Sequence, residues 1–210
     1  MRLLLLSLGT GALPDFIADH VGRPASTVRL GYLDDAARPY AGLPFVAAER
    51  ARIVAQGYRV IALTAGDFED PAAFGATLEG LDALYVAGGN TFALLAALRR
   101  RNVDAALVAQ VQAGLPYIGA SAGAIVTGPS IEPASLMDDP AEAPALAERR
   151  GLGLVDTVVI PHADGALPPY PPALIAEIRR TYGATYPLTF LDDDQALRID
   201  DAAPRLIASP

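Results

Sequence analysis

The sequence contains no cysteine, and this absence excludes disulfides, thiolate metal sites and a cysteine nucleophile. Positive charge is also scarce, because 16 Lys and Arg residues face 24 Asp and Glu residues and leave a net charge of −8. A protein that binds nucleic acid needs a basic face, so we expect no nucleic-acid partner. An acidic small substrate is still compatible with this balance, since a few local arginines can outweigh the overall field.

Long hydrophobic runs are absent as well, and no stretch reaches the length of a membrane span. The apolar segment from Arg2 to Gly9 is short and lacks the small-residue cleavage site of a signal peptide. It runs into Gly-Thr-Gly, as a first buried strand would. We therefore expect a cytoplasmic protein without a membrane partner.

The 210 residues, 52% of them hydrophobic and 19% charged, are typical of a globular domain, and we expect residues 1–210 to form one. Short apolar runs alternate with Ala- and Leu-rich stretches. This pattern predicts a doubly wound α/β fold, with a mostly parallel sheet, helices on both faces and a C-terminal β-hairpin. The predicted strands are Leu3–Leu8, Val28–Leu33, Arg59–Thr64, Ala83–Ala87, Pro116–Gly119, Thr157–Ile160 and Leu188–Leu191, with Ala196–Ile199 and Arg205–Ile207 as the hairpin. The predicted helices are Pro44–Gln56, Pro71–Leu78, Thr91–Arg100, Val103–Ala113 and Pro172–Tyr182.

One long irregular stretch, Pro129–Arg150, interrupts this alternation. It is rich in Pro, Ala, Asp and Glu and carries Asp138 and Asp139. Long loops in compact domains are usually functional or disordered. Because this one follows a serine-containing turn directly, we expect it to border the site.

The serine turn is Gly119-Ala120-Ser121-Ala122-Gly123, between a predicted strand and a predicted helix. This is the G-x-S-x-G pattern of a nucleophile elbow, in which a sharp turn raises the serine hydroxyl and only small neighbours fit. The Ala122 N–H, at the start of the helix, can stabilise an oxyanion. The alternative is a glycine-rich turn that contains a serine by chance.

A second turn, Gly88-Gly89-Asn90-Thr91, also lies between a strand and a helix. Ligands of open α/β sheets bind at the carboxyl ends of strands, so both turns can share one crevice. Gly88 and Gly89 allow the backbone to approach a substrate, and an N–H here can be the second oxyanion donor. Asn90 and Thr91 can simply cap the helix. Capping alone does not explain the two glycines.

A serine nucleophile needs a base, and the sequence offers only two histidines, His20 and His162. His162 follows the strand ending at Ile160, which places it on the same rim as Ser121, whereas His20 is interpreted as a surface or packing residue. The histidine in turn needs an acid to fix its tautomer.

Three consecutive aspartates, Asp192, Asp193 and Asp194, follow the strand Leu188–Leu191, and one of them is a good candidate for the acid. The order along the chain would then be Ser, His, Asp. The ordinary α/β-hydrolase order of Ser, Asp, His would require Asp138 or Asp139 instead.

Together these segments resemble the peptidase E family of serine dipeptidases, which are relatives of the class I glutamine amidotransferase fold. The resemblance implies Ser121 as nucleophile, His162 as base and Asp193 as acid, with Gly89 and Ala122 as oxyanion donors. We expect neither a metal nor a cofactor. The matching segments, in family order and at family-like spacing, are Val86–Phe92, Tyr117–Ala124, Pro161–His162 and Leu191–Leu197.

Two features depart from the family members that cleave after an amino-terminal aspartate. Those members carry Thr-Asn-Asp-Met-Pro in the loop after the serine, where this chain has Ser-Leu-Met-Asp-Asp-Pro at residues 135–140. They also place an arginine on the helix after the histidine, whereas Arg179 and Arg180 lie further along here. Catalysis is thus better supported than aspartyl specificity. The residues expected to contact substrate are Gly88, Asn90, Thr91, Asp138 and Asp139.

The leading hypothesis is a serine exopeptidase of the dipeptidase E type that hydrolyses short peptides, those with an amino-terminal Asp among the candidates. The alternatives are a cyanophycinase-like enzyme, another serine amidase or esterase, and a non-enzymatic small-molecule binding module. Cyanophycinases are longer chains and match less well, and a binder has no need of a serine, a histidine and an acid together. A short peptide is the expected partner, and a homodimer is an open alternative to a monomer.

Overall fold

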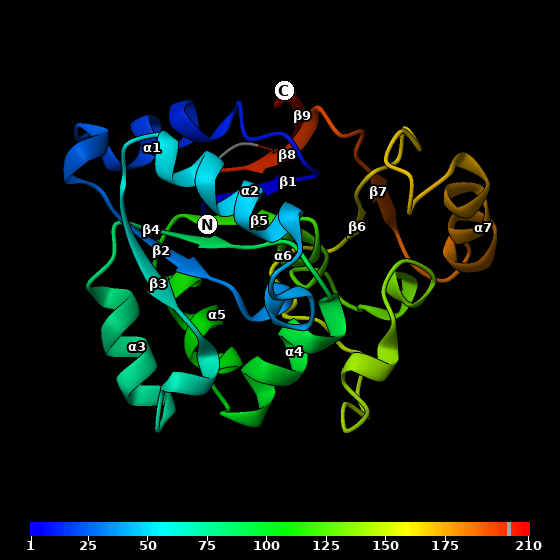
Figure 1. Cartoon of the computed structure of the whole chain (residues 1–210), viewed down its shortest axis with the longest axis horizontal. Coiled ribbons are helices and arrows are strands. Elements are labelled where there is room, and N and C mark those ends of the chain that lie inside the picture. Colours follow the sequence, from blue (N-terminus) through cyan, green and yellow to red (C-terminus); the bar gives the residue numbers. More distant parts are fainter. Residues whose placement is uncertain (201–202) are drawn as a thin grey trace.

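The computed structural model describes residues 1–200 and 203–210 and has an α/β architecture built on a seven-stranded sheet (Figure 1). The order of the strands in this sheet is β3-β2-β4-β5-β1-β8-β9. The strands are β1 Leu3–Leu6, β2 Arg29–Leu33, β3 Arg59–Leu63, β4 Ala83–Val86, β5 Tyr117–Ala120, β6 Val158–Ile160, β7 Leu188–Phe190, β8 Gln195–Ile199 and β9 Arg205–Ala208. The helices are α1 Leu13–Val21, α2 Pro44–Ala55, α3 Pro71–Glu79, α4 Thr91–Arg100, α5 Asp104–Gln112, α6 Ala122–Ile125 and α7 Pro172–Tyr182.

The first five strands of the sheet, β3-β2-β4-β5-β1, are parallel, and β8 and β9 close one edge as an antiparallel hairpin. Helices α1 and α2 cover one face, while α3, α4 and α5 cover the other (Figure 1). This arrangement confirms the predicted fold class, including the C-terminal hairpin. Because the strands are parallel, β1, β4 and β5 all end at the same rim.

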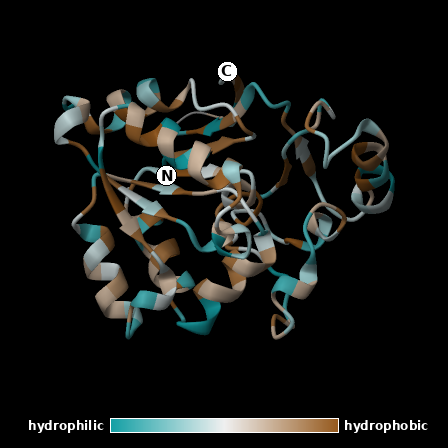
Figure 2. Ribbon diagram, in the orientation of Figure 1, coloured by the Kyte–Doolittle hydropathy of each residue, from teal (hydrophilic) through white to brown (hydrophobic). Residues whose placement is uncertain are grey.

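The strands β1, β2, β4 and β5 contribute buried side chains to a core on both faces of the sheet. In β1, Leu3 and Leu5 pack into the cluster below α3, α4 and α5, while Leu4 and Leu6 pack into the cluster beside α1 and α2. This follows from the alternation of side chains along a strand and explains why the strand is a continuous apolar run. Figure 2 shows brown and teal residues side by side in α7, which buries Ile175 and Ile178 on one face.

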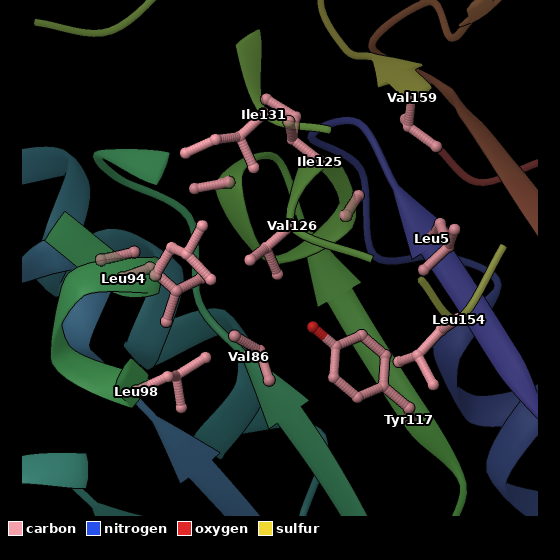
Figure 3. Close-up of a cluster of buried hydrophobic side chains, with 14 of the residues drawn as sticks. Leu5, Val86, Leu94, Leu98, Tyr117, Ile125, Val126, Ile131, Leu154 and Val159 are labelled. Carbon is pink, nitrogen blue, oxygen red and sulfur yellow. The ribbon is translucent and has the colours of Figure 1, made fainter. Parts of the chain in front are cut away.

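The larger cluster surrounds the end of β5 (Figure 3). Tyr117 on β5 is fully buried, and its hydroxyl donates a 2.6 Å hydrogen bond to the carbonyl of Gly123 beyond the strand. Val86 from β4 and Leu94 from α4 pack in the same cluster. The serine turn is therefore tied to the core below it.

A second, two-stranded sheet pairs β6 with β7 in parallel and lies beside the main sheet together with α7 (Figure 1). The side chains of β6 are buried, and Val159 reaches the large cluster, whereas β7 is half-buried throughout. Both strands follow the sequence-based boundaries closely, but their separation from the main sheet was not foreseen.

The irregular stretch Pro129–Arg150 is held by short 3-10 turns at Glu132–Leu136 and Pro140–Glu142. Its ends pair through an isolated bridge between Ser130 and Arg150. In the described parts of the chain, no helix combines the length and apolar character needed to cross a bilayer.

Candidate active site

Ser121 sits between β5 and α6 in a backbone conformation that few non-glycine residues adopt, with φ 46° and ψ −108°. Its N–H donates to the carbonyl of Leu6 on the neighbouring strand β1 at 3.0 Å. The glycines of the turn are needed for space: a Cβ at Gly119 would lie 2.2 Å from the Gly123 carbonyl oxygen, and one at Gly123 would lie 2.3 Å from that of Val86. The sharp strand–turn–helix geometry is the one that the small residues predict.

The glycine turn after β4 packs directly against Ser121. An ideal Cβ at Gly88 would stand 3.4 Å from the Ser121 Cβ. Gly89 has φ 138°, and a Cβ there would lie 2.1 Å from the carbonyl oxygen of Ala36, so the position requires glycine. The two turns thus form one crevice at the rim of the sheet, as expected.

The backbone amides of these turns differ in what they contact. The Gly88 N–H donates to Glu49 Oε1 at 3.0 Å, so it is already engaged. Within residues 1–200 and 203–210, the N–H groups of Gly89 and Ala122 have no hydrogen-bond partner. Two free donors beside a serine hydroxyl suit the stabilisation of an oxyanion.

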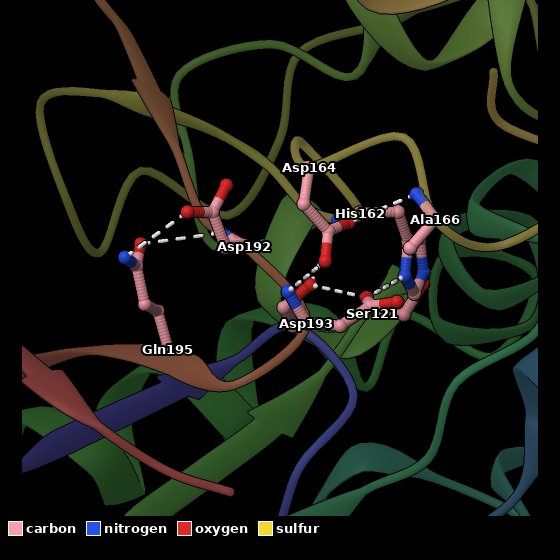
Figure 4. A network of polar contacts seen from close by, with 8 residues as sticks. Ser121, His162, Asp164, Ala166, Asp192, Asp193 and Gln195 are labelled. Atoms are coloured by element: carbon pink, nitrogen blue, oxygen red, sulfur yellow. Dashed lines mark hydrogen bonds and ion pairs between the residues drawn. The ribbon is translucent and has the colours of Figure 1, made fainter. Parts of the chain in front are cut away.

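His162 follows β6 and directs its Nε2 at the Ser121 Oγ, 3.2 Å away (Figure 4). Its backbone has φ 60°, and its ring stacks on Tyr170 with centroids 4.7 Å apart and planes 6° from parallel. Burial lowers the pKa of His162 below its ordinary value of 6.5, while the hydrogen bond and charge of Asp193 oppose this change. A neutral imidazole near pH 7 is the form that accepts a proton.

Asp193 follows β7 and completes the chain of contacts, with Oδ1 2.6 Å from His162 Nδ1. The Asp192 carboxylate instead accepts a 3.2 Å hydrogen bond from the Gln195 side chain, and the backbone carbonyl of Asp194 accepts one from the Ser209 N–H. Figure 4 shows Asp193 beside His162 and Asp192 turned toward Gln195. Of the three candidates for the acid, Asp193 is the one that the structure places against the imidazole.

Ser7, immediately after β1, was missed by the sequence reasoning. Its hydroxyl donates to Asp193 Oδ1 at 3.2 Å and accepts a 2.7 Å hydrogen bond from the backbone N–H of His162. A single side chain from the main sheet therefore orients both residues that come from the small sheet. The available signal was its position, since Ser7 is a polar residue at the carboxyl end of a buried strand.

A cavity of about 480 Å³ opens in front of Ser121 and His162. Its walls are largely apolar, and it also receives two charged residues of α2, Glu49 and Arg52. The apolar wall includes Tyr40, Leu43, Phe45, Met137, Leu167 and Tyr170. Met137 shows that the stretch Pro129–Arg150 borders the cavity.

Hydrogen bonds join the start of α4 to the stretch Pro129–Arg150. The residues involved are Asn90, Thr91, Asp138 and Asp139. Asn90 caps α4 by accepting from the Ala93 N–H at 2.9 Å, and its amide donates to the Asp139 carbonyl at 3.0 Å. Asp138 accepts from the Thr91 N–H at 2.8 Å and from its hydroxyl at 2.6 Å. Burial raises the pKa of Asp138 to about 6. Their role as substrate contacts stays a prediction, while Gly88 does line the cavity.

Within residues 1–200 and 203–210, no group of three or more His, Asp or Glu side chains is arranged to hold a metal ion. What this site offers chemically is a hydroxyl, an imidazole and a carboxylate in series, beside two free amide donors.

The sequence model described as Peptidase family S51 matches residues 3–207. Among curated proteins, the uncharacterized peptidase PM1590 of Pasteurella multocida is 39% identical over 118 residues, which cover 56% of this chain and 56% of that protein. Peptidase E of Streptomyces coelicolor is 45% identical over 87 residues, which cover 41% of this chain and 34% of that protein. The chain thus spans about half the length, or less, of these curated relatives.

Solved structures show the same likeness over nearly the whole chain. A crystal structure of a "Putative Peptidase E Protein" from Listeria monocytogenes EGD-e superposes with a TM-score of 0.82 and 26% identity, covering 99% of this chain and 98% of that one. A peptidase from an acI-B1 actinobacterium superposes with a TM-score of 0.66 at 17% identity, covering 99% of this chain and 94% of that one, which supports the fold alone.

Proposed function

The chain belongs to peptidase family S51, and from that premise we propose that it hydrolyses short peptides with Ser121 as the nucleophile. The observation that carries this proposal is the continuous contact from Ser121 Oγ through His162 to Asp193, with distances of 3.2 and 2.6 Å. These are the lengths at which a proton can pass between a hydroxyl and an imidazole that a carboxylate orients.

Acylation follows from this geometry. His162 Nε2 takes the proton of Ser121 Oγ as the oxygen forms a bond with the carbonyl carbon of the scissile peptide. The carbonyl oxygen becomes an anion, which the Gly89 and Ala122 N–H groups stabilise by hydrogen bonds. When the tetrahedral intermediate collapses, the C–N bond breaks and His162 gives its proton to the leaving amine.

Deacylation repeats the same steps with water. His162 accepts a proton from a water molecule, whose oxygen attacks the ester carbon, and then returns that proton to Ser121 Oγ. The carboxylic acid product leaves and the enzyme is restored. Asp193 keeps the Nδ1 proton in place and stabilises the imidazolium that forms in each half of the cycle.

The cavity supports a short substrate. Its volume of about 480 Å³ lies within the range of small-ligand sites, and its apolar walls can bury peptide side chains. Arg52 in the wall is a cation that can meet a substrate carboxylate, so peptides with an amino-terminal Asp belong among those tested. The peptide substrate is the partner that we propose.

Two measurements test the function together. A fluorophosphonate should label Ser121, as shown by mass spectrometry of the labelled peptide, and a dipeptide library that includes Asp-X members should yield free amino acids. Labelling with hydrolysis of esters but of no peptide would reassign the chain as an esterase. A protein that is neither labelled nor active would contradict the serine mechanism.

A further inference from the structure

A buried carboxylate, Glu49, stands next to the nucleophile and has no part in the steps above. Glu49 belongs to α2 and is 7% exposed. Its Oε1 accepts two hydrogen bonds, from the Tyr85 hydroxyl at 2.9 Å and from the Gly88 N–H at 3.0 Å. The Glu49 side chain therefore links α2 to the glycine turn after β4.

The second oxygen of Glu49 lies beside the Gly88 backbone, which Ser121 also adjoins. An ideal Cβ at Gly88 would lie 3.4 Å from Glu49 Oε2 and also 3.4 Å from the Ser121 Cβ, so the carboxylate and the serine share one side of the Gly88 backbone. Glu49 also forms part of the cavity wall that contains Ser121 and His162. In the described parts of the chain, Oε2 has no hydrogen-bond donor within reach.

The charge of Glu49 also lacks a counterion in contact. No ion pair within residues 1–200 and 203–210 involves this carboxylate, and Arg52 acts on it only at longer range. Burial raises its pKa, and the two donated hydrogen bonds and Arg52 oppose that rise. A buried carboxylate with one oxygen open to a cavity is stabilised by a cation that enters the cavity.

The free amino terminus of a peptide is such a cation. When the scissile bond is the first of the chain, the α-ammonium nitrogen is two covalent bonds from the carbonyl carbon that Ser121 attacks. A carboxylate beside the serine can therefore hold the ammonium while the carbonyl oxygen points at the Gly89 and Ala122 N–H groups. A blocked or internal peptide would leave Glu49 without a partner and would bring an uncharged amide against it.

We infer that Glu49 binds the α-ammonium group of the substrate and so restricts hydrolysis to the first peptide bond. The inference rests on the proposed peptidase function and assigns a determinant of its specificity. A purely structural Glu49 would instead hold the glycine turn in place and have no influence on which amino termini are accepted.

The variant Glu49→Gln separates these two roles. The amide oxygen of glutamine can accept the same hydrogen bonds from Tyr85 and Gly88, while the open oxygen is replaced by an NH₂ group without charge. Glu79→Gln on α3 is the matched control, because Glu79 is exposed and contacts the side chain of Gln110 rather than the cavity. Thermal unfolding and the rate of fluorophosphonate labelling report whether the fold and the nucleophile are intact.

The substrates are the dipeptide hydrolysed fastest in the library assay, its N-acetyl derivative and its analogue with an α-hydroxyl in place of the amine. The wild type and Glu79→Gln should prefer the free amine at least about tenfold in kcat/KM, since a charged hydrogen bond is involved. In Glu49→Gln, kcat/KM for the free amine should fall about tenfold to a hundredfold, mainly through KM, while the N-acetyl peptide changes little.

Two results would overturn the inference. The first is a wild type that hydrolyses the amine, hydroxyl and N-acetyl forms equally, which decides the matter even if Glu49→Gln does not fold. The second is a folded Glu49→Gln variant that keeps the wild-type preference. Either leaves peptide hydrolysis itself intact, whereas failure of the proposed function would appear as a wild type with no hydrolysis and no labelling of Ser121.

Discussion

The main sheet and the small sheet supply different halves of the candidate site. From the main sheet come Ser121 and the Gly89 turn, which follow β5 and β4. From the small sheet come His162 and Asp193, which follow β6 and β7. The 3.2 Å contact between Ser121 Oγ and His162 Nε2 is thus also a contact between the two sheets.

The two halves are held by different means. The main-sheet half depends on backbone conformation and on space, since a Cβ at Gly89 would lie 2.1 Å from the Ala36 carbonyl oxygen. The small-sheet half depends on side chains, namely the 2.6 Å contact of Asp193 with His162 and the hydroxyl of Ser7 that joins both. Substitutions should therefore act on the two halves in different ways.

The largest effect should come from the main-sheet half. Ser121→Ala should lower peptide hydrolysis by about 10⁴-fold or more, because the nucleophile is lost. The fold should persist, since alanine suits a turn that already consists of alanine and glycine. Steady-state kinetics and thermal unfolding measure the two properties, and retained activity in a clean preparation would reject the serine mechanism.

The second-largest loss of activity is expected from substitution of Asp193 in the small-sheet half. Asp193→Asn should lower turnover by about 10⁴-fold, because the amide favours the wrong imidazole tautomer. The double variant Asp138→Asn, Asp139→Asn is the comparison: it should keep most of the turnover but unfold at a lower temperature, since Asp138 is buried against Thr91. The reverse outcome, with turnover lost in the double variant alone, would favour the order Ser, Asp, His.

A smaller effect is expected at the link between the halves. Ser7→Ala removes the hydrogen bonds to Asp193 and to the His162 backbone, and kcat should fall about tenfold with KM little changed. Ser135→Ala is a matched control, since that hydroxyl bonds to Glu132 and Tyr182 instead. An unchanged kcat in Ser7→Ala would show that His162 and Asp193 keep their positions relative to Ser121 without the Ser7 hydroxyl.

The smallest effect concerns pH. Burial lowers the pKa of His162 below 6.5, and the base must be neutral, so the acidic limb of the kcat/KM profile should have its midpoint below pH 6.5. Tyr170→Ala uncovers one face of the ring and should move the midpoint upward, toward the ordinary value. His20→Gln should leave the limb in place. Movement of the limb in His20→Gln instead would assign the base to the other histidine.

Local sequence patterns correctly predicted several elements and residues of both halves. The Ala- and Leu-rich run after Asn90 was enough to predict α4 to the residue, at Thr91–Arg100, and a proline in the first turn helped to predict α7, at Pro172–Tyr182. Ser121 was found because the small residues around it are required by a sharp turn between strand and helix. Ser121, His162 and Asp193 were each placed at strand ends, and the structure brings the three into contact.

Other features of the structure have no recognisable pattern in the local sequence. The apolar run Val158–Ile160 would look the same in either sheet, so its pairing with β7 alone could not be predicted. The first strand was expected to continue to Leu8 but ends at Leu6, and this longer boundary placed Ser7 inside a strand. Glu49 lies on a helix that is mostly exposed, where a charged residue is typical of the surface, and its burial depends on a turn 39 residues further along.

The positive φ of Ser121 has a consequence for how such a chain changes over generations. A serine held at φ 46° destabilises the folded state by about 1 to 3 kcal/mol, a large share of the roughly 5 to 15 kcal/mol by which domains are stable. Glycine would relieve this strain, so selection for stability and selection for activity oppose each other at this position. Relatives that no longer need peptidase activity would therefore be expected to carry glycine at position 121, and these inactive proteins would be the more stable ones.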